Sequence, residues 1–164
     1  MIFVGIGANL HHPVHGEPRA TCEAALEALR AADLEIVRRS AWYRSAPVPI
    51  SDQPWFVNAV VELATVSGPA ELLARLHRIE DRFGRVRAAR NEARVLDLDL
   101  LAYHDRVSAP GETPQLPHPR LAERSFVLLP LAELAPDWRD PRDDRPIAAL
   151  IAQLPEGQHI ERTD

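Results

Sequence analysis

The sequence RVLDLDLL at residues 94–101 predicts a β-strand that carries two carboxylates. The run is short and alternates apolar with acidic side chains, which is typical of a half-buried strand. Residues i and i+2 of a strand point to the same face, so Asp97 and Asp99 stand side by side while the alternate leucines face the core. Because neighbouring carboxylates repel each other, this strand predicts a bound cation.

Mg²⁺ is the cation that two aspartates at this spacing favour. With roughly 6.5–7 Å between their Cα atoms, Asp97 and Asp99 can share one ion or bridge two ions about 3.5–4 Å apart. Mg²⁺ takes one or two carboxylates and completes its shell with water and substrate phosphates. By itself the pair also fits two solvated aspartates on the exposed face of an edge strand.

An arginine cluster lies directly before the aspartates and consists of Arg85, Arg87, Arg90 and Arg94. A guanidinium group holds phosphate oxygens with a planar fork of donors. The alternative is a solvated loop paired with nearby acidic residues. Because the arginines adjoin a pair of Mg²⁺-type ligands, we favour a polyphosphate substrate, neutralised by metal on one side and by arginine on the other.

The order of predicted elements indicates the fold. Hydrophobic periodicity predicts strands at 2–7, 34–43, 55–65 and 94–103, helices at 17–32 and 68–83, and a further helix near 121–134. Strand, helix, strand, strand, helix, strand is the ferredoxin-like split βαβ order, an α+β fold. We therefore expect a mainly antiparallel sheet with helices packed on one face, in a single domain over residues 1–164. Residues 137–164 are expected to form a loosely structured tail.

Composition excludes several classes of protein. The 164 residues are 46% hydrophobic and 26% charged, with a net charge of −5, which disfavours broad nucleic-acid binding. All 19 basic residues are arginine, so a P-loop lysine and Schiff-base chemistry are excluded, and the single cysteine, Cys22, excludes an internal disulfide. Without a membrane-length apolar run or a signal-peptide pattern, we expect a cytoplasmic protein.

Three weaker patterns remain open. Phe56 and Asn58 share one strand face, where a ring and an amide can stack on and bond a flat heterocycle, or can cap the core and hold a loop. His118, between two prolines, can donate to a phosphate or be merely exposed. Gly7 suits either a left-handed backbone conformation or a close backbone approach. The tract His11, His12 and His15 lacks a metal-binding pattern, and we interpret it as incidental.

Taken in order, the segments resemble the 6-hydroxymethyl-7,8-dihydropterin pyrophosphokinases, enzymes of folate biosynthesis. The resemblance runs from about Ile2 to Trp138. It is carried by IGANL at 6–10, YRSAPV at 43–48, DQPWFVNAVV at 52–61, HRIEDRFGRVR at 77–87, RVLDLDLLAY at 94–103 and LPHPRLAERSFVLLPLAELAP at 116–136. The combination of these motifs is specific, whereas any one of them is not.

The resemblance implies a reaction and a set of site residues. ATP would give its β,γ-pyrophosphoryl group to the hydroxymethyl oxygen of the dihydropterin and leave as AMP, with two Mg²⁺ ions held by Asp97 and Asp99. The implied pterin-binding residues are Gly7, Ser45, Pro47, Val48, Phe56, Asn58 and Phe126. The implied ATP-binding residues are Glu80, Arg85, Arg87, Arg94, Leu100, Gln115, His118 and Arg124. Arg85 and Arg94, together with the two aspartates, are the expected catalytic residues.

The sequence also predicts which partners the protein has and leaves two alternative functions to be weighed. We expect small-molecule substrates, no nucleic acid, no membrane and a monomer. A segment at 85–93 is expected to close over ATP. One alternative is a non-catalytic ferredoxin-like module that binds a pterin, and another is a ferredoxin-like nucleic-acid-binding domain with exposed aromatic residues and a basic face. The aspartate pair, the arginines and the acidic net charge count against both alternatives.

Overall fold

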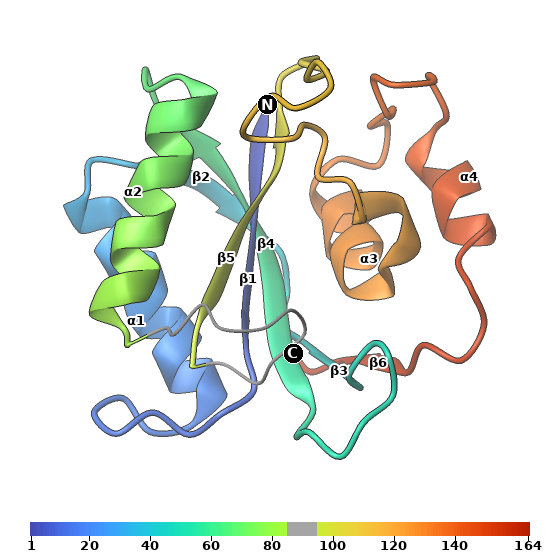
Figure 1. Ribbon diagram of the computed structural model, residues 1–164. Coiled ribbons are helices and arrows are strands. Elements are labelled where there is room, and N and C mark those ends of the chain that lie inside the picture. The colour runs from blue at the N-terminus through green and yellow to red at the C-terminus, as the bar shows by residue number, and fades with distance from the viewer. Residues whose placement is uncertain (85–94) are drawn as a thin grey trace.

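The computed structural model describes residues 1–84 and 95–164 as a sheet flanked by helices (Figure 1). Within these ranges the elements are β1 (Ile2–Ala8), α1 (Pro18–Ala31), β2 (Glu35–Arg39), β3 (Tyr43–Ser45), β4 (Phe56–Ala64), α2 (Pro69–Arg82), β5 (Asp97–Tyr103), a 3₁₀ turn (Leu121–Glu123), α3 (Ser125–Leu134), α4 (Ile147–Ala152) and β6 (Ile160–Arg162). None of the helices described is long and apolar enough to cross a membrane.

The sheet is antiparallel in every pairing among the described strands. Its order is β5-β1-β4-β3-β6, and β2 pairs with β4. β1 is therefore an inner strand, which pairs with β4 on one side and with β5 on the other. The α+β class and the mainly antiparallel sheet are confirmed.

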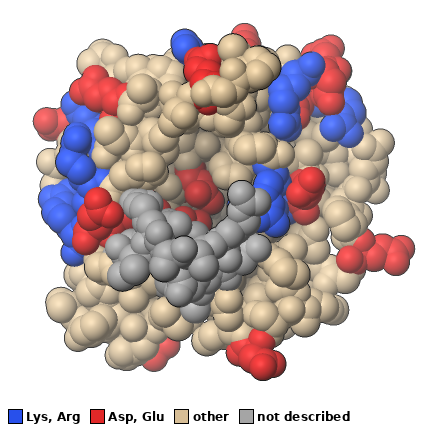
Figure 2. Space-filling model, in the orientation of Figure 1, with Lys and Arg blue, Asp and Glu red and all other residues tan. Residues whose placement is uncertain are grey.

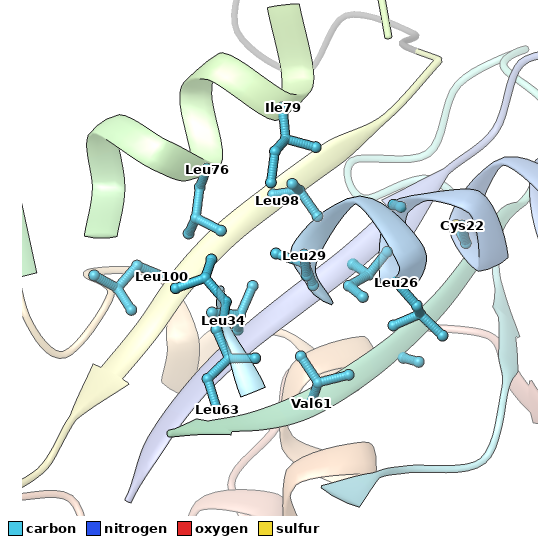
Figure 3. Packing of buried hydrophobic residues seen from close by; sticks show 14 of the residues in the cluster. Cys22, Leu26, Leu29, Leu34, Val61, Leu63, Leu76, Ile79, Leu98 and Leu100 are labelled. Carbon is cyan, nitrogen blue, oxygen red and sulfur yellow. The ribbon is translucent and has the colours of Figure 1, made fainter. Parts of the chain in front are cut away.

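The first face of the sheet is covered by α1 and α2 (Figure 1). Pro18 and Pro69 begin these two helices, at positions where proline is tolerated because the first amides of a helix have no intrahelical acceptor. Their apolar stripes meet the inward side chains of the central strands, and Figure 3 shows Leu29, Leu76 and Leu98 in that layer. This cluster is the main core.

The second face is divided into a covered end and an open end. Phe3, Val60 and Leu101 point to this face and are buried beneath α3. The expectation of helices on one face therefore holds for α1 and α2 but not for α3, because the outer positions of β1 and β4 are apolar at this end and need cover. The other end of the same face carries polar residues and glycines.

The strand predicted at 34–43 is broken into β2 and β3, which both lie along the same edge of β4. The break falls at Ser40. Its amide donates to Val60 O (2.9 Å), but its hydroxyl, not its carbonyl, accepts the Val60 amide (3.0 Å). Because a side chain replaces one rung of the backbone ladder, regular pairing stops there.

The segment expected as a loose tail is instead structured. Trp138, Ile147 and Leu150 are buried in the cluster beneath α3, and β6 pairs with β3. The apolar residues of this segment are sparse and separated by charged stretches, so local periodicity did not reveal them. The expectation of a single domain stays a prediction.

Candidate active site

The open end of the second face has a floor of glycine. On β1, Gly7 lies opposite Asn58 of β4 and Asp97 of β5, and Gly5 lies opposite Asp99. These residues share one face, so the two glycines leave a strip of bare backbone between the amide and the carboxylates. The absence of side chains on the central strand creates the hollow.

A cleft opens over this floor. Its lining includes Gly7, Pro47, Val48, Phe56, Asn58 and Phe126, six of the seven residues that the resemblance assigned to a pterin, and also Asp97, Asp99 and Arg124. Figure 2 shows the hollow near the centre of this view, with acidic side chains inside it and basic side chains at its edge. The cleft thus combines an aromatic and amide wall with a carboxylate end.

Ser45, the seventh residue, lies behind the lining and is buried. Its hydroxyl accepts a hydrogen bond from Asn58 Nδ2 (2.6 Å). That bond fixes the amide orientation so that Asn58 Oδ1 is directed toward Gly7, where a Cβ would come within 2.9 Å of it. Ser45 therefore orients the amide that the cleft presents.

The loop between β3 and β4 forms one wall, and Asn9 holds it to the end of β1. Asn9 is buried, and its Nδ2 donates to Gln53 Oε1 (3.1 Å) and to Pro54 O (3.1 Å). Gln53 itself lines the cleft. Sequence reasoning missed both residues, because their proximity depends on how the loop folds back over β1.

The acidic end of the cleft carries a cation beside one carboxylate. Arg124 Nη1 lies 3.8 Å from Asp99 Oδ2, and its guanidinium lies 5.4 Å from the centre of the Phe126 ring. Only 14% of the Arg124 side chain is exposed, so its charge is poorly screened by water. The sequence placed Arg124 with ATP, and the structure places it where the cleft meets the aspartates.

A second hollow adjoins the cleft at Asp99, which lines both. Its lining includes four residues expected at the ATP site, namely Glu80, Leu100, Gln115 and His118. The Glu80 carboxylate is almost fully buried and accepts the Leu98 amide (2.7 Å), so it also ties α2 to β5. The cleft and the hollow together offer two adjoining compartments, with Asp99 at their junction and Asp97 in the cleft on the same face of β5.

His118 is held in a defined protonation state. Burial lowers its pKa to about 4, with the nearby Arg124 charge acting in the same direction and Asp97 acting against it. Its Nδ1 accepts the Arg120 amide (3.2 Å), which leaves the proton of the neutral ring on Nε2. His118 is therefore a neutral hydrogen-bond donor at physiological pH.

The donor set fits Mg²⁺ that is completed by substrate. Among residues 1–84 and 95–164, no group of three or more His, Cys, Asp or Glu side chains converges. Asp97 and Asp99 supply two carboxylates on one face, which is what Mg²⁺ uses together with phosphate oxygens and water. A protein-only cage of the zinc type is not present in the described part of the chain.

The predicted set of site residues differs from the residues that line the cleft in the structure. The whole predicted arginine cluster (Arg85, Arg87, Arg90 and Arg94) and the segment expected to close over ATP lie outside the described residues. Lining residues that the sequence did not single out are Gly5, Ile6, Ala46, Pro49, Ser51, Ala59 and Val127. Gly5 had a detectable signal, since it stands two residues before Gly7 on the same strand face.

Comparison with known proteins gives a consistent result. A family model described as 7,8-dihydro-6-hydroxymethylpterin-pyrophosphokinase (HPPK) matches residues 3–136. A Synechocystis protein named 2-amino-4-hydroxy-6-hydroxymethyldihydropteridine pyrophosphokinase is 42% identical over 151 residues, which cover 92% of this chain and 74% of the relative. A Pseudomonas aeruginosa protein of the same name is 41% identical over 157 residues, covering 94% and 91%.

A plant relative is longer. The mitochondrial folate synthesis bifunctional protein of Pisum sativum is 35% identical over 133 residues, which cover 81% of this chain but 25% of that protein.

Gly7→Ala should destabilise the protein and disturb the cleft. The added methyl would lie 2.9 Å from Asn58 Oδ1, and Asn58 cannot move without weakening its bond to Ser45. We expect a loss of about 1–3 kcal/mol in the free energy of unfolding, measured by urea denaturation. Gly5→Ala is the control, because its methyl would meet Leu101 at an ordinary 3.5 Å. Equal losses in both variants would contradict the assigned contact.

His118→Asn should make stability less sensitive to acid. The folded pKa is about 4, against 6.5 for an unperturbed histidine, so between these values only the unfolded chain takes up the proton. The wild type therefore loses stability as pH falls from 6.5 to 4, and this contribution vanishes in the variant. Urea denaturation at pH 7 and pH 4.5 measures the difference, with exposed His159→Asn as the control. If the free energy of unfolding changes between pH 7 and pH 4.5 by the same amount in His118→Asn as in the wild type, the lowered pKa of His118 is disproved.

Proposed function

The chain belongs to the 7,8-dihydro-6-hydroxymethylpterin-pyrophosphokinase family, and from this membership we propose that it transfers the β,γ-pyrophosphoryl group of ATP to 6-hydroxymethyl-7,8-dihydropterin in folate synthesis. In this reaction the hydroxymethyl oxygen bonds to the β-phosphorus, the bond from that phosphorus to the α-phosphate oxygen breaks, and AMP leaves. The hydroxyl proton passes to solvent. The enzyme is a diphosphotransferase that depends on Mg²⁺.

The observation that carries the proposal is the position of Asp97 and Asp99. Both line the cleft, and Asp99 also lines the second hollow. A transfer between two substrates needs the donor in one compartment, the acceptor in the other and the reacting atoms at their boundary. Asp99 stands at that boundary and Asp97 lies on the same face of β5, so Mg²⁺ held by the two carboxylates would there neutralise the phosphate oxygens of ATP.

The cleft has the chemistry that a flat, polar heterocycle requires. Phe56 and Phe126 supply aromatic surface, and the Asn58 amide supplies hydrogen bonds to a ring edge. Because Ser45 and Gly7 fix this amide, its orientation is set before the ligand binds. These features support the pterin as acceptor.

The hollow on the other side of Asp99 has donors for a nucleotide. His118 offers Nε2–H without a charge. Gln115 lines the same hollow, and its Nε2 donates to Ala109 O and Glu112 O. Arg124 lies at the boundary, where it can offset charge that builds on the transferred group. Arg85, Arg87 and Arg94 belong to the same proposal on the strength of the sequence.

The wider expectations belong with this proposal. The net charge of −5 supports small-molecule substrates over nucleic acid. A cytoplasmic monomer without membrane partners remains the expected form. One assay distinguishes the enzyme from a pterin-binding module without catalysis. Only the enzyme releases AMP when ATP, Mg²⁺ and the dihydropterin are supplied together.

Asp97→Asn tests the role of the carboxylates. The amide keeps the shape of the side chain but removes one of two negative charges that would hold Mg²⁺, so AMP release should fall roughly 100-fold or more. Circular dichroism and the melting temperature should remain close to those of the wild type.

The matched control is Asp105→Asn, an exposed aspartate two residues beyond the end of β5. It should keep wild-type turnover and the same dependence on Mg²⁺. Turnover by Asp97→Asn at the wild-type rate would rule out the metal-binding role. An inactive wild type that still binds the dihydropterin would favour the non-catalytic module.

A further inference from the structure

We propose that Gln158 is the residue that positions Arg124, and that the segment before β6 is thereby part of the active-site architecture. The inference rests on the proposed function for its kinetic consequence, but the contacts themselves are independent of it. Gln158 lies 33 residues after Ser125 in the sequence and outside every motif of the family resemblance. It touches none of the substrates' expected compartments directly.

Helix α3 begins without a capping side chain of its own. The N-cap residue is Arg124, whose side chain makes no capping hydrogen bond. The first amides of a helix have no intrahelical acceptor, and an N-cap Ser, Thr, Asp or Asn normally supplies one. Here the Ser125 amide donates to Gln158 Oε1 (2.9 Å), so a distant side chain performs the capping.

The Gln158 side chain also binds the residue before Arg124. Gln158 Nε2 donates to Glu123 O (2.6 Å). One amide group therefore binds the carbonyl that precedes Arg124 and the amide that follows it. Arg124 has extended dihedrals, φ −118° and ψ 113°, between the 3₁₀ turn and α3. These two bonds fix the backbone from which the guanidinium projects.

Two contacts of the Arg124 guanidinium depend on the position of that backbone. Arg124 Nη1 lies 3.8 Å from Asp99 Oδ2, and the guanidinium lies over the Phe126 ring. Both partners line the cleft. A displacement of about 1 Å at a reacting centre can cost up to roughly 100-fold in rate. Loss of the Gln158 bonds would displace the Arg124 guanidinium at the boundary where the transferred group would lie.

The next residue, His159, is bonded to the β3–β4 loop, which forms another wall of the cleft. His159 O accepts the Ala46 amide (2.9 Å), and β6 then pairs with β3. Ala46, on the β3–β4 loop, and Val127, on α3, both line the cleft. Figure 1 shows the chain running from α4 to β6 along this side of the molecule. Two consecutive residues of the tail thus connect both walls.

The experiment compares Gln158→Leu with Gln153→Leu, each with and without Arg124→Ala. Leucine keeps the bulk of glutamine but has neither donor nor acceptor. Gln153 is the matched control, because it is an exposed glutamine near the same part of the chain and accepts from Arg145 alone among the bonds described for its side chain. Pyrophosphoryl transfer is followed as AMP release, and Ser125 amide exchange is followed by NMR.

Gln158→Leu should lower kcat/KM roughly tenfold, while Gln153→Leu should change it less than about twofold. In the Arg124→Ala background, Gln158→Leu should cost less than about a further twofold, because the side chain that it positions is already gone. The Ser125 amide should exchange faster in Gln158→Leu than in the wild type. A purely structural role would instead lower activity by the same factor in both backgrounds.

The proposal is overturned by wild-type kcat/KM in Gln158→Leu, by equal losses in the two backgrounds, or by unchanged Ser125 exchange. If the leucine variant does not fold, Gln158→Asn, which is one methylene too short to reach both partners, replaces it with Gln153→Asn as control. If the wild type itself releases no AMP, the proposed function fails, and the exchange of Ser125 still decides whether Gln158 holds this turn.

Discussion

The site depends on the register of one central strand. Gly7 of β1 stands between Asn58 on one neighbour and Asp97 on the other, and Gly5 stands beside Asp99. Because both glycines point to the same face, the sheet is bare where the cleft forms and side-chain-rich where α3 covers it. A shift of the register by one residue would turn the aspartates into the core and the leucines into the cleft.

Polar side chains stabilise that face through hydrogen bonds to residues far away in the sequence. Asn9 holds the β3–β4 loop, Glu80 holds β5 to α2, and Glu133 of α3 accepts the Ala41 amide (2.7 Å) and the Tyr43 hydroxyl (2.9 Å). The Leu98 amide, the Ala41 amide and the Tyr43 hydroxyl belong to buried residues and would lose these partners without the two glutamates. The walls of the cleft are therefore held by hydrogen bonds as well as by packing.

Local patterns were sufficient for the elements that bury a regular stripe or an alternating face. The aspartate strand, both helices on the first face and the grouping of Phe56 with Asn58 follow from periodicity alone. The cover provided by α3, the break at Ser40 and the structured tail could not be predicted this way. Each depends on a contact between distant segments, such as Ser40 with Val60 or Gln158 with Ser125, and no local period encodes such a contact.

The two edges of the sheet also bear on how the protein behaves at high concentration. On one side, β2 and β3 lie next to β4 and are separated by the break at Ser40. In β2 the exposed Val37 is followed by Arg38 and Arg39. On the other side β5 carries a bulge at Leu101, whose carbonyl accepts the His118 amide (2.8 Å). Short, charged or occupied edges resist pairing with a second molecule. The break that spoils a regular strand thus protects the fold against aggregation through its open β-edges.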